Sequence, residues 1–185
     1  MLHEIRWHGR AGQGVITVSR LLAQAAMNEK KHAQAFPEFG PERIGAPISG
    51  YTRIDTEPID LHCRIYEPDI VVVLDPSLLR ILNVVEGLKR GGKLVLNTKE
   101  DLSKGGGRVK PGDYDVFTID ATRICLDILG STKALNTIML GALIKASNLV
   151  SLDSVLSAIG ERFTGPVLQK NIELINRGYS EVKGL

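Results

Sequence analysis

The segment Ile70-Val71-Val72-Val73-Leu74 is an uninterrupted apolar run with three valines and an isoleucine. β-Branched side chains pack well in extended backbone. A strand without apolar–polar alternation is typical of a parallel sheet that is covered on both faces. The run therefore predicts a buried central strand over residues 69–74, in a protein of the α/β class.

The rest of the chain alternates predicted strands and helices. We expect further strands at 3–8, 48–55, 61–65, 93–97 and 115–119, with 48–55 and 61–65 forming a hairpin. Apolar residues at helical spacing predict helices at 15–27, 76–89, 121–129, 135–146, 152–162 and 167–179. Without repeats or a visible boundary, the prediction is one domain over residues 1–185. It would be a Rossmann-like, doubly wound α/β fold, with a mostly parallel sheet, helices on both faces and a helical C-terminal part.

Charge and hydropathy exclude several classes of function. The formal net charge of the 185 residues is only +2, and Lys and Arg are scattered along the chain. No strong field exists to attract nucleic acid or an anionic membrane. The apolar stretches are too short to cross a bilayer, and the first residues lack a signal-peptide pattern. We expect a cytoplasmic protein without nucleic-acid or membrane partners.

The cysteines and histidines do not form a metal-binding pattern. Cys63 and Cys125 are far apart, whereas an iron–sulfur cluster usually needs four thiolates and structural zinc needs clustered Cys and His. Both cysteines are predicted to lie in the core. No two of the four histidines have ligand spacing, and no nucleophile–base–acid set is visible. The sequence therefore predicts neither a metal site nor a catalytic residue.

A glycine-rich turn, Gly-Arg-Ala-Gly-Gln-Gly at residues 9–14, joins the first predicted strand to the first predicted helix. Such a turn directs backbone N–H groups and a helix N-terminus toward an anion, usually phosphate. Glycine avoids the Cβ that would block close approach. The turn departs from the strict dinucleotide fingerprint, and the next strand lacks a terminal acid for a ribose. Two interpretations stay open: a phosphate site with Arg10, Gly12, Gln13 and Gly14, or a structural turn.

A loop rich in Pro and Gly occupies residues 36–50. Its prolines exclude a regular helix or central strand, while Phe36, Phe39 and Ile44 indicate that it packs against something. Glu42 and Arg43 can clamp a ligand, contact a partner, or form a weak exposed pair.

Two further polar residues stand where a ligand can bind. Asp75 follows the buried strand and can contact a ligand, although capping the next helix is the favoured role. Asn136 either caps its helix or touches a ligand. Gly141, in the same helix, is expected to allow close helix packing.

The order of these motifs resembles one family. The turn at 9–14, the loop at 39–47, the strand at 68–75 and the segment Asn-Thr-Ile-Met-Leu-Gly at 136–141 resemble those of gamma subunits of 2-oxoacid:ferredoxin oxidoreductases. The closest similarity is to the pyruvate:ferredoxin oxidoreductases (pyruvate synthases). It covers nearly the whole chain, through residues 171–179.

The resemblance implies a subunit of an enzyme that converts pyruvate, coenzyme A and oxidised ferredoxin to acetyl-CoA, carbon dioxide and reduced ferredoxin. Thiamine diphosphate and Mg would be held by partner subunits, the former by alpha and beta, and iron–sulfur clusters by beta and delta. This chain would bind no cofactor alone, and would help to bind coenzyme A and to assemble the complex. The residues implied are Arg10, Gly12, Gln13, Gly14, Glu42, Arg43 and Asn136.

Two other functions stay open at this point. A stand-alone nucleotide-binding reductase would need a ribose-binding acid and a proton donor, which the sequence does not identify. A purely structural interaction subunit would use the glycine turn for its shape alone and the Pro-rich loop as its interface. The sequence does not determine which 2-oxoacid the complex uses.

Overall fold

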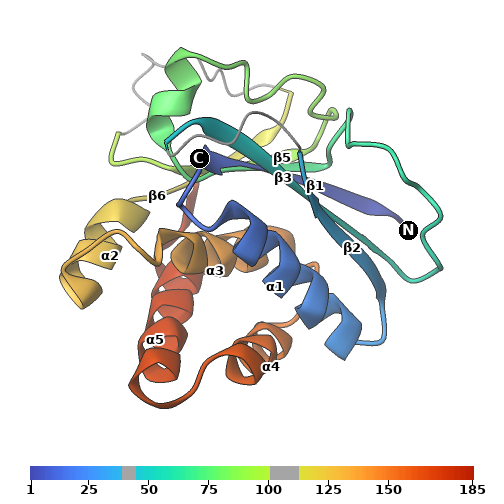
Figure 1. The fold of residues 1–185 in the computed structure, drawn as a ribbon. Coiled ribbons are helices and arrows are strands. Elements are labelled where there is room, and N and C mark those ends of the chain that lie inside the picture. The colour runs from blue at the N-terminus through green and yellow to red at the C-terminus, as the bar shows by residue number, and fades with distance from the viewer. Residues whose placement is uncertain (39–44, 101–112) are drawn as a thin grey trace.

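The computed structural model describes residues 1–38, 45–100 and 113–185. Its centre is a seven-stranded sheet with the strand order β2-β3-β1-β4-β5-β6-β7 (Figure 1). The strands are β1 (His3–Arg10), β2 (His32–Pro37), β3 (Pro47–Asp55), β4 (Ile70–Val73), β5 (Lys93–Asn97), β6 (Asp115–Ile119) and β7 (Lys183–Gly184).

The middle of the sheet is parallel, as the apolar run of β4 predicts. β1, β4, β5 and β6 are parallel neighbours, while β3 pairs antiparallel with both β1 and β2, and β7 pairs antiparallel with β6. The register places His8 of β1 opposite Ser49 of β3 and Val73 of β4. β4 is buried throughout, and the predicted α/β class with a parallel centre is confirmed.

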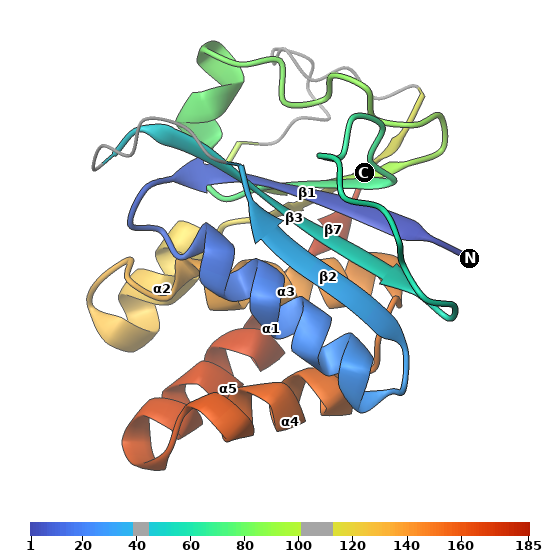
Figure 2. The ribbon, with the colours of Figure 1, turned by 45° about the vertical axis from the view of Figure 1, so that its right-hand side comes forward.

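Five helices lie together on one face of this sheet (Figures 1 and 2). They are α1 (Val15–Asn28), α2 (Ala121–Leu129), α3 (Leu135–Ser147), α4 (Leu152–Arg162) and α5 (Gly165–Glu181). α3 is apolar around most of its circumference, and nearly all of its residues are buried, as expected for the central helix of a layer. No helix in the described ranges is both long and apolar enough to span a bilayer.

The opposite face carries less helix than the sequence predicts. The expected helix at 76–89 is only one 3-10 turn, η1 (Pro76–Arg80), followed by turns. Within the predicted helix, Gly87 has a φ of +72°, which is not a helical conformation, and a Cβ there would lie 2.2 Å from the carbonyl oxygen of Tyr66. η1 and the turns cover a smaller apolar cluster, made of Val71, Val73, Leu78, Val84, Leu94, Leu96 and Val116.

The predicted hairpin of 48–55 with 61–65 is wrong. β3 uses both of its edges to pair with β1 and β2, so no edge of β3 is left for a strand at 61–65. Cys63, which we expected in the core, is consequently exposed, whereas Cys125 is buried as expected. β2 and β3 also extend into the predicted 36–50 loop, with Pro37 and Pro47 at strand ends, where a missing amide donor is tolerated.

Two glycines set the distance between α3 and α5. A Cβ at Gly141 would lie 2.2 Å from the carbonyl oxygen of Ile175, and a Cβ at Gly178 would lie 2.1 Å from that of Ile138. Both clashes are with backbone, which cannot swing aside as a side chain can. The two helix backbones therefore touch through these glycines, and the predicted packing role of Gly141 is confirmed.

We expect Gly141→Ala and Gly178→Ala each to lower the free energy of unfolding by roughly 2 kcal/mol, because the added methyl group forces α3 and α5 apart. Gly160→Ala in α4 is the matched control, since a Cβ there meets nothing within 4 Å. The control should be neutral or stabilise by up to about 1 kcal/mol through helix propensity. Urea unfolding of the three variants measures the difference. Equal stabilities for all three would contradict the contact.

Candidate functional site

The glycine-rich turn lies at the carboxyl end of β1, directly before α1. Gly12 and Gly14 have φ values of +97° and +74°, which favour glycine. A Cβ at Gly12 would meet no described residue within 4 Å, so the described part of the chain leaves this side of the turn open. Gly14 caps α1 without a side-chain hydrogen bond. The positive end of α1 therefore lies at this turn.

Neighbouring segments hold the turn on two sides. The amide of Ala11 donates to the carbonyl of Ala46 at 2.9 Å, and the amide of Gly45 donates to the carbonyl of Ala11 at 3.3 Å. From the helical layer, Asn136 Nδ2 donates to the carbonyl of Gly14 at 3.2 Å. The chain entering β3 and the start of α3 thus fix the shape of the turn.

Asp75 connects the turn to β4. Its Oδ2 accepts from Arg10 Nε at 3.0 Å and from Gln13 Nε2 at 3.1 Å. Its Oδ1 accepts from the amide of Ser77 at 2.9 Å and from the Ser77 hydroxyl. Burial works to raise the pKa of Asp75, but these hydrogen bonds and the charge of Arg10 outweigh it and lower the pKa. The predicted capping role of Asp75 is confirmed, and the residue also spans the gap between β1 and β4.

This gap is the switch point of the sheet. After β1 the chain passes to α1 on one face, and after β4 it passes to η1 on the other (Figure 1). In open α/β sheets, ligands bind outside the carboxyl ends of the strands at such a point. The glycine turn therefore stands where this architecture offers a ligand site.

The structure brings together Arg10, Gly12, Gln13, Gly14 and Asn136 from the predicted set, while Glu42 and Arg43 lie outside the described residues. The three polar side chains point inward. Arg10 is bound to Asp75, to the carbonyl of Gly45 and to the Ser77 hydroxyl, and Gln13 Oε1 accepts from the amide of Arg10 at 2.8 Å. The amides of Gly12 and Gly14 have no acceptor among the described residues. Any anion held here would be held chiefly by backbone donors.

Within the described ranges, no three His, Cys, Asp or Glu side chains form a group that could hold a metal ion. The described residues of the predicted set offer a ligand hydrogen-bond donors and the positive end of a helix. Binding and orientation are what such a site can supply.

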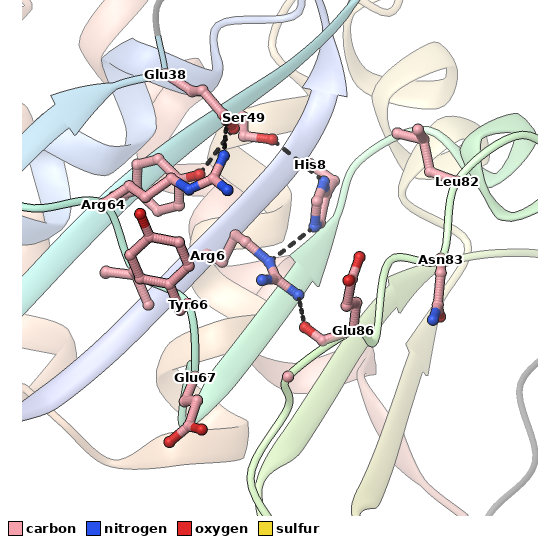
Figure 3. Close-up of a pocket in the computed structure, with 13 residues that line it drawn as sticks. Arg6, His8, Glu38, Ser49, Arg64, Tyr66, Glu67, Leu82, Asn83 and Glu86 are labelled. Atoms are coloured by element: carbon pink, nitrogen blue, oxygen red, sulfur yellow. Dashed lines mark hydrogen bonds and ion pairs between the residues drawn. The ribbon is translucent and has the colours of Figure 1, made fainter.

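Sequence reasoning missed the polar face of β1. Ile5 and Trp7 point into the helical layer, but Arg6 and His8, which alternate with them, point to the other face. There they line a cavity of about 460 Å³, bounded by β3 and by the segments 64–67 and 82–87 (Figure 3). Central strands of a parallel sheet are normally apolar on both faces. The alternation His-Glu-Ile-Arg-Trp-His in a strand that leads into a glycine turn was the available signal.

His8 is neutral in this cavity. Its side chain is buried, and its Nε2 accepts from Arg6 Nε at 3.1 Å, which leaves the proton on Nδ1, 3.5 Å from the Ser49 hydroxyl. Burial, and then the charge of Arg6, lower the pKa of His8 to about 4. A protonated His8 could no longer accept the hydrogen bond from Arg6.

The sequence pattern of the pyruvate ferredoxin/flavodoxin oxidoreductase family matches residues 4–181. The chain belongs to this family. The family resemblance inferred from the motifs is thereby confirmed.

Individual members of the family align with the chain from end to end. The pyruvate synthase subunit PorC of Methanocaldococcus jannaschii is 48% identical over 180 residues, which are 97% of this chain and 96% of the relative. The common gamma subunit of the pyruvate/ketoisovalerate oxidoreductases of Thermococcus kodakarensis is 47% identical over 178 residues, 96% of each chain. The crystal structure of the pyruvate oxidoreductase subunit PORC of Thermotoga maritima superposes with a TM-score of 0.86 and 38% identity, covering 99% of this chain and 98% of that one.

Because His8 is buried and neutral, we expect it to make the free energy of unfolding depend on pH. This contribution is separate from the contribution of the carboxylates. The pKa of His8 is about 4 in the folded chain against an ordinary 6.5. Between these values the unfolded chain binds the proton more strongly, so stability is full above about pH 6.5 and falls as the pH drops toward 4. From pH 7.5 to 5.0 the loss should be about 2 kcal/mol.

His8→Gln should remove most of this pH dependence, since the amide oxygen of Gln can accept from Arg6 without titrating. His62→Gln, at an exposed position, is the control and should keep it. Urea unfolding at the two pH values measures both. An unchanged pH slope in His8→Gln would contradict the assignment of the neutral state.

Proposed function

We propose that this chain is the gamma subunit of a pyruvate:ferredoxin oxidoreductase complex, in which it acts as one domain. The complex converts pyruvate, coenzyme A and oxidised ferredoxin to acetyl-CoA, carbon dioxide and reduced ferredoxin. The observation that carries the proposal is the end-to-end match to PorC, with 48% identity over 97% of this chain. Its location in the cytoplasm stays a prediction.

Within the complex, the chain contributes to binding coenzyme A. The open side of the turn, the amides of Gly12 and Gly14 and the positive end of α1 together suit a phosphate group of this substrate. Arg10, Gln13 and Asn136 support the binding by fixing the turn. Glu42 and Arg43 are proposed as further coenzyme A contacts on the family resemblance alone.

The chemical steps belong to the partners. Alpha, beta and delta subunits hold thiamine diphosphate, Mg and the iron–sulfur clusters, and ferredoxin accepts the electrons from the complex. The cofactors perform the bond-breaking chemistry, while this chain positions a substrate. Holding coenzyme A in place lowers the entropic barrier to bringing its thiol to the acyl group.

Gly12→Val in the reconstituted complex tests the coenzyme A role. The valine side chain would stand over the open side of the turn and keep a phosphate from the amides. We expect the KM for coenzyme A to rise roughly tenfold or more, the value of about one charge-assisted hydrogen bond, while the KM for pyruvate stays the same. Steady-state kinetics at varied concentrations of each substrate measures both constants.

Gly91→Val is the matched control for backbone strain. Gly91 also has a positive φ, +72°, and a Cβ added there would meet no described residue within 4 Å, but it precedes β5, at the amino end of the parallel strands and away from the glycine turn. It should leave the KM for coenzyme A unchanged. An unaltered coenzyme A dependence in an intact Gly12→Val complex would reject the phosphate site and favour the structural role of the turn. Saturable NAD(P) binding by the purified chain would instead favour a nucleotide-dependent reductase.

A further inference from the structure

Arg6 is a buried cation whose hydrogen-bond acceptors are all neutral. Its side chain sits on a central strand, and the residue is only 8% exposed. Nε donates to His8, and Nη2 donates to the carbonyls of Val84 and Glu86. None of the ion pairs formed by the described residues includes Arg6. Buried charges in proteins are normally paired with an opposite charge, and the described residues supply no such partner for Arg6.

The remaining donor of Arg6 opens into the cavity of Figure 3. Nη1 makes no hydrogen bond to a described residue, yet no buried side-chain nitrogen or oxygen in the described ranges lacks a partner. Among the described residues Nη1 is thus uncommitted, and Arg6 lines the cavity of about 460 Å³. That volume is in the range of small-molecule sites.

The acidic residues around the cavity do not neutralise Arg6. Glu38 accepts from Arg64 at 3.1 Å and from the Tyr51 hydroxyl at 2.7 Å, so its charge is already paired. Glu86 offers Arg6 its backbone carbonyl, while its carboxylate forms no ion pair with Arg6 and favours the charged guanidinium only through its longer-range field. With Glu67 also lining the cavity, the surroundings would repel a doubly charged anion more than a singly charged one.

We propose that this cavity binds a small carboxylic acid as its monoanion, with the carboxylate paired to Arg6 Nη1 on the face of the sheet that carries η1. Arg6 would supply the charge, while the neutral His8 and the Ser49 hydroxyl would leave the guanidinium as the dominant charge at the floor. The site uses neither Gly12 nor Gly14. It is therefore independent of the proposed coenzyme A role.

Titration of the full chain with simple acids tests the ligand class. Acetate and pyruvate should bind saturably and shift the same amide signals around β1 in a two-dimensional NMR spectrum. Acetamide, the neutral counterpart of acetate, should not bind. Inorganic phosphate at pH 8.5, where nearly all of it is the dianion, should bind at least tenfold more weakly than acetate at the same pH and ionic strength. Equal binding of acetamide, or phosphate binding as tight as that of acetate, would overturn the proposal.

Two substitutions act in opposite directions at the proposed site. Arg6→Gln should weaken acetate binding at least tenfold, while Glu86→Gln should strengthen it severalfold by removing a nearby negative charge. Arg90→Gln, whose side chain is 89% exposed, is the control and should leave binding unchanged. If Arg6→Gln does not fold, Glu86→Gln still decides, because an unaltered affinity in that variant overturns the site.

A partner's acidic side chain is the competing occupant. In that case no small acid would bind the full chain, and Arg6→Gln would weaken assembly of the complex. This pair of results would overturn the small-ligand proposal. Assembly that is unaffected by Arg6→Gln, with acetate binding lost, would support it.

Discussion

The carboxylate of Asp75 is the interaction on which the carboxyl edge of the sheet depends. It accepts hydrogen bonds from Arg10 and Gln13 in the turn after β1, and from Ser77 at the start of η1. The chain leaves β1 and β4 toward opposite faces, so the strand ends would otherwise be joined only through the sheet. Asp75 thus joins the turn to the start of η1, and Arg10, which also donates to the carbonyl of Gly45, adds the chain entering β3 to the same unit.

β1, which leads into the glycine turn, contacts different surroundings on its two faces. On one face, Ile5 and Trp7 join the large apolar cluster, and Trp7 Nε1 donates to the Thr52 hydroxyl at 3.1 Å. On the other face, Arg6 and His8 form the floor of a polar cavity. β1 can be apolar on one face and polar on the other because the helices pack on one side of the sheet, while η1 and turns cover the other side only in part (Figure 2). A second full layer of helices would have required apolar residues at both positions.

Features that depend on neighbouring residues were predictable from the sequence, and features that depend on distant partners were not. β5, β6, α2 and α4 have the predicted bounds, because apolar periodicity and caps such as Asp120 and Ser151 are local signals. Several extended segments could have paired with β3, and the sequence does not show which ones do. The predicted partner, 61–65, was therefore wrong. At the site, the turn was identified by its glycines. The inward direction of Arg10 was not, because its partner Asp75 is 65 residues away.

The structural role of the glycine turn is compatible with the proposed anion site. Arg10 donates to Asp75, Gly45 and Ser77, and Gln13 donates to Asp75, so both side chains brace the turn. That bracing fixes Gly12 and Gly14 in left-handed conformations, and the open amides are therefore already in place before an anion arrives. Donors that need no rearrangement hold charge more effectively than flexible side chains do. The polar residues of the motif would thus act on coenzyme A through the backbone, and binding would depend most on the glycines.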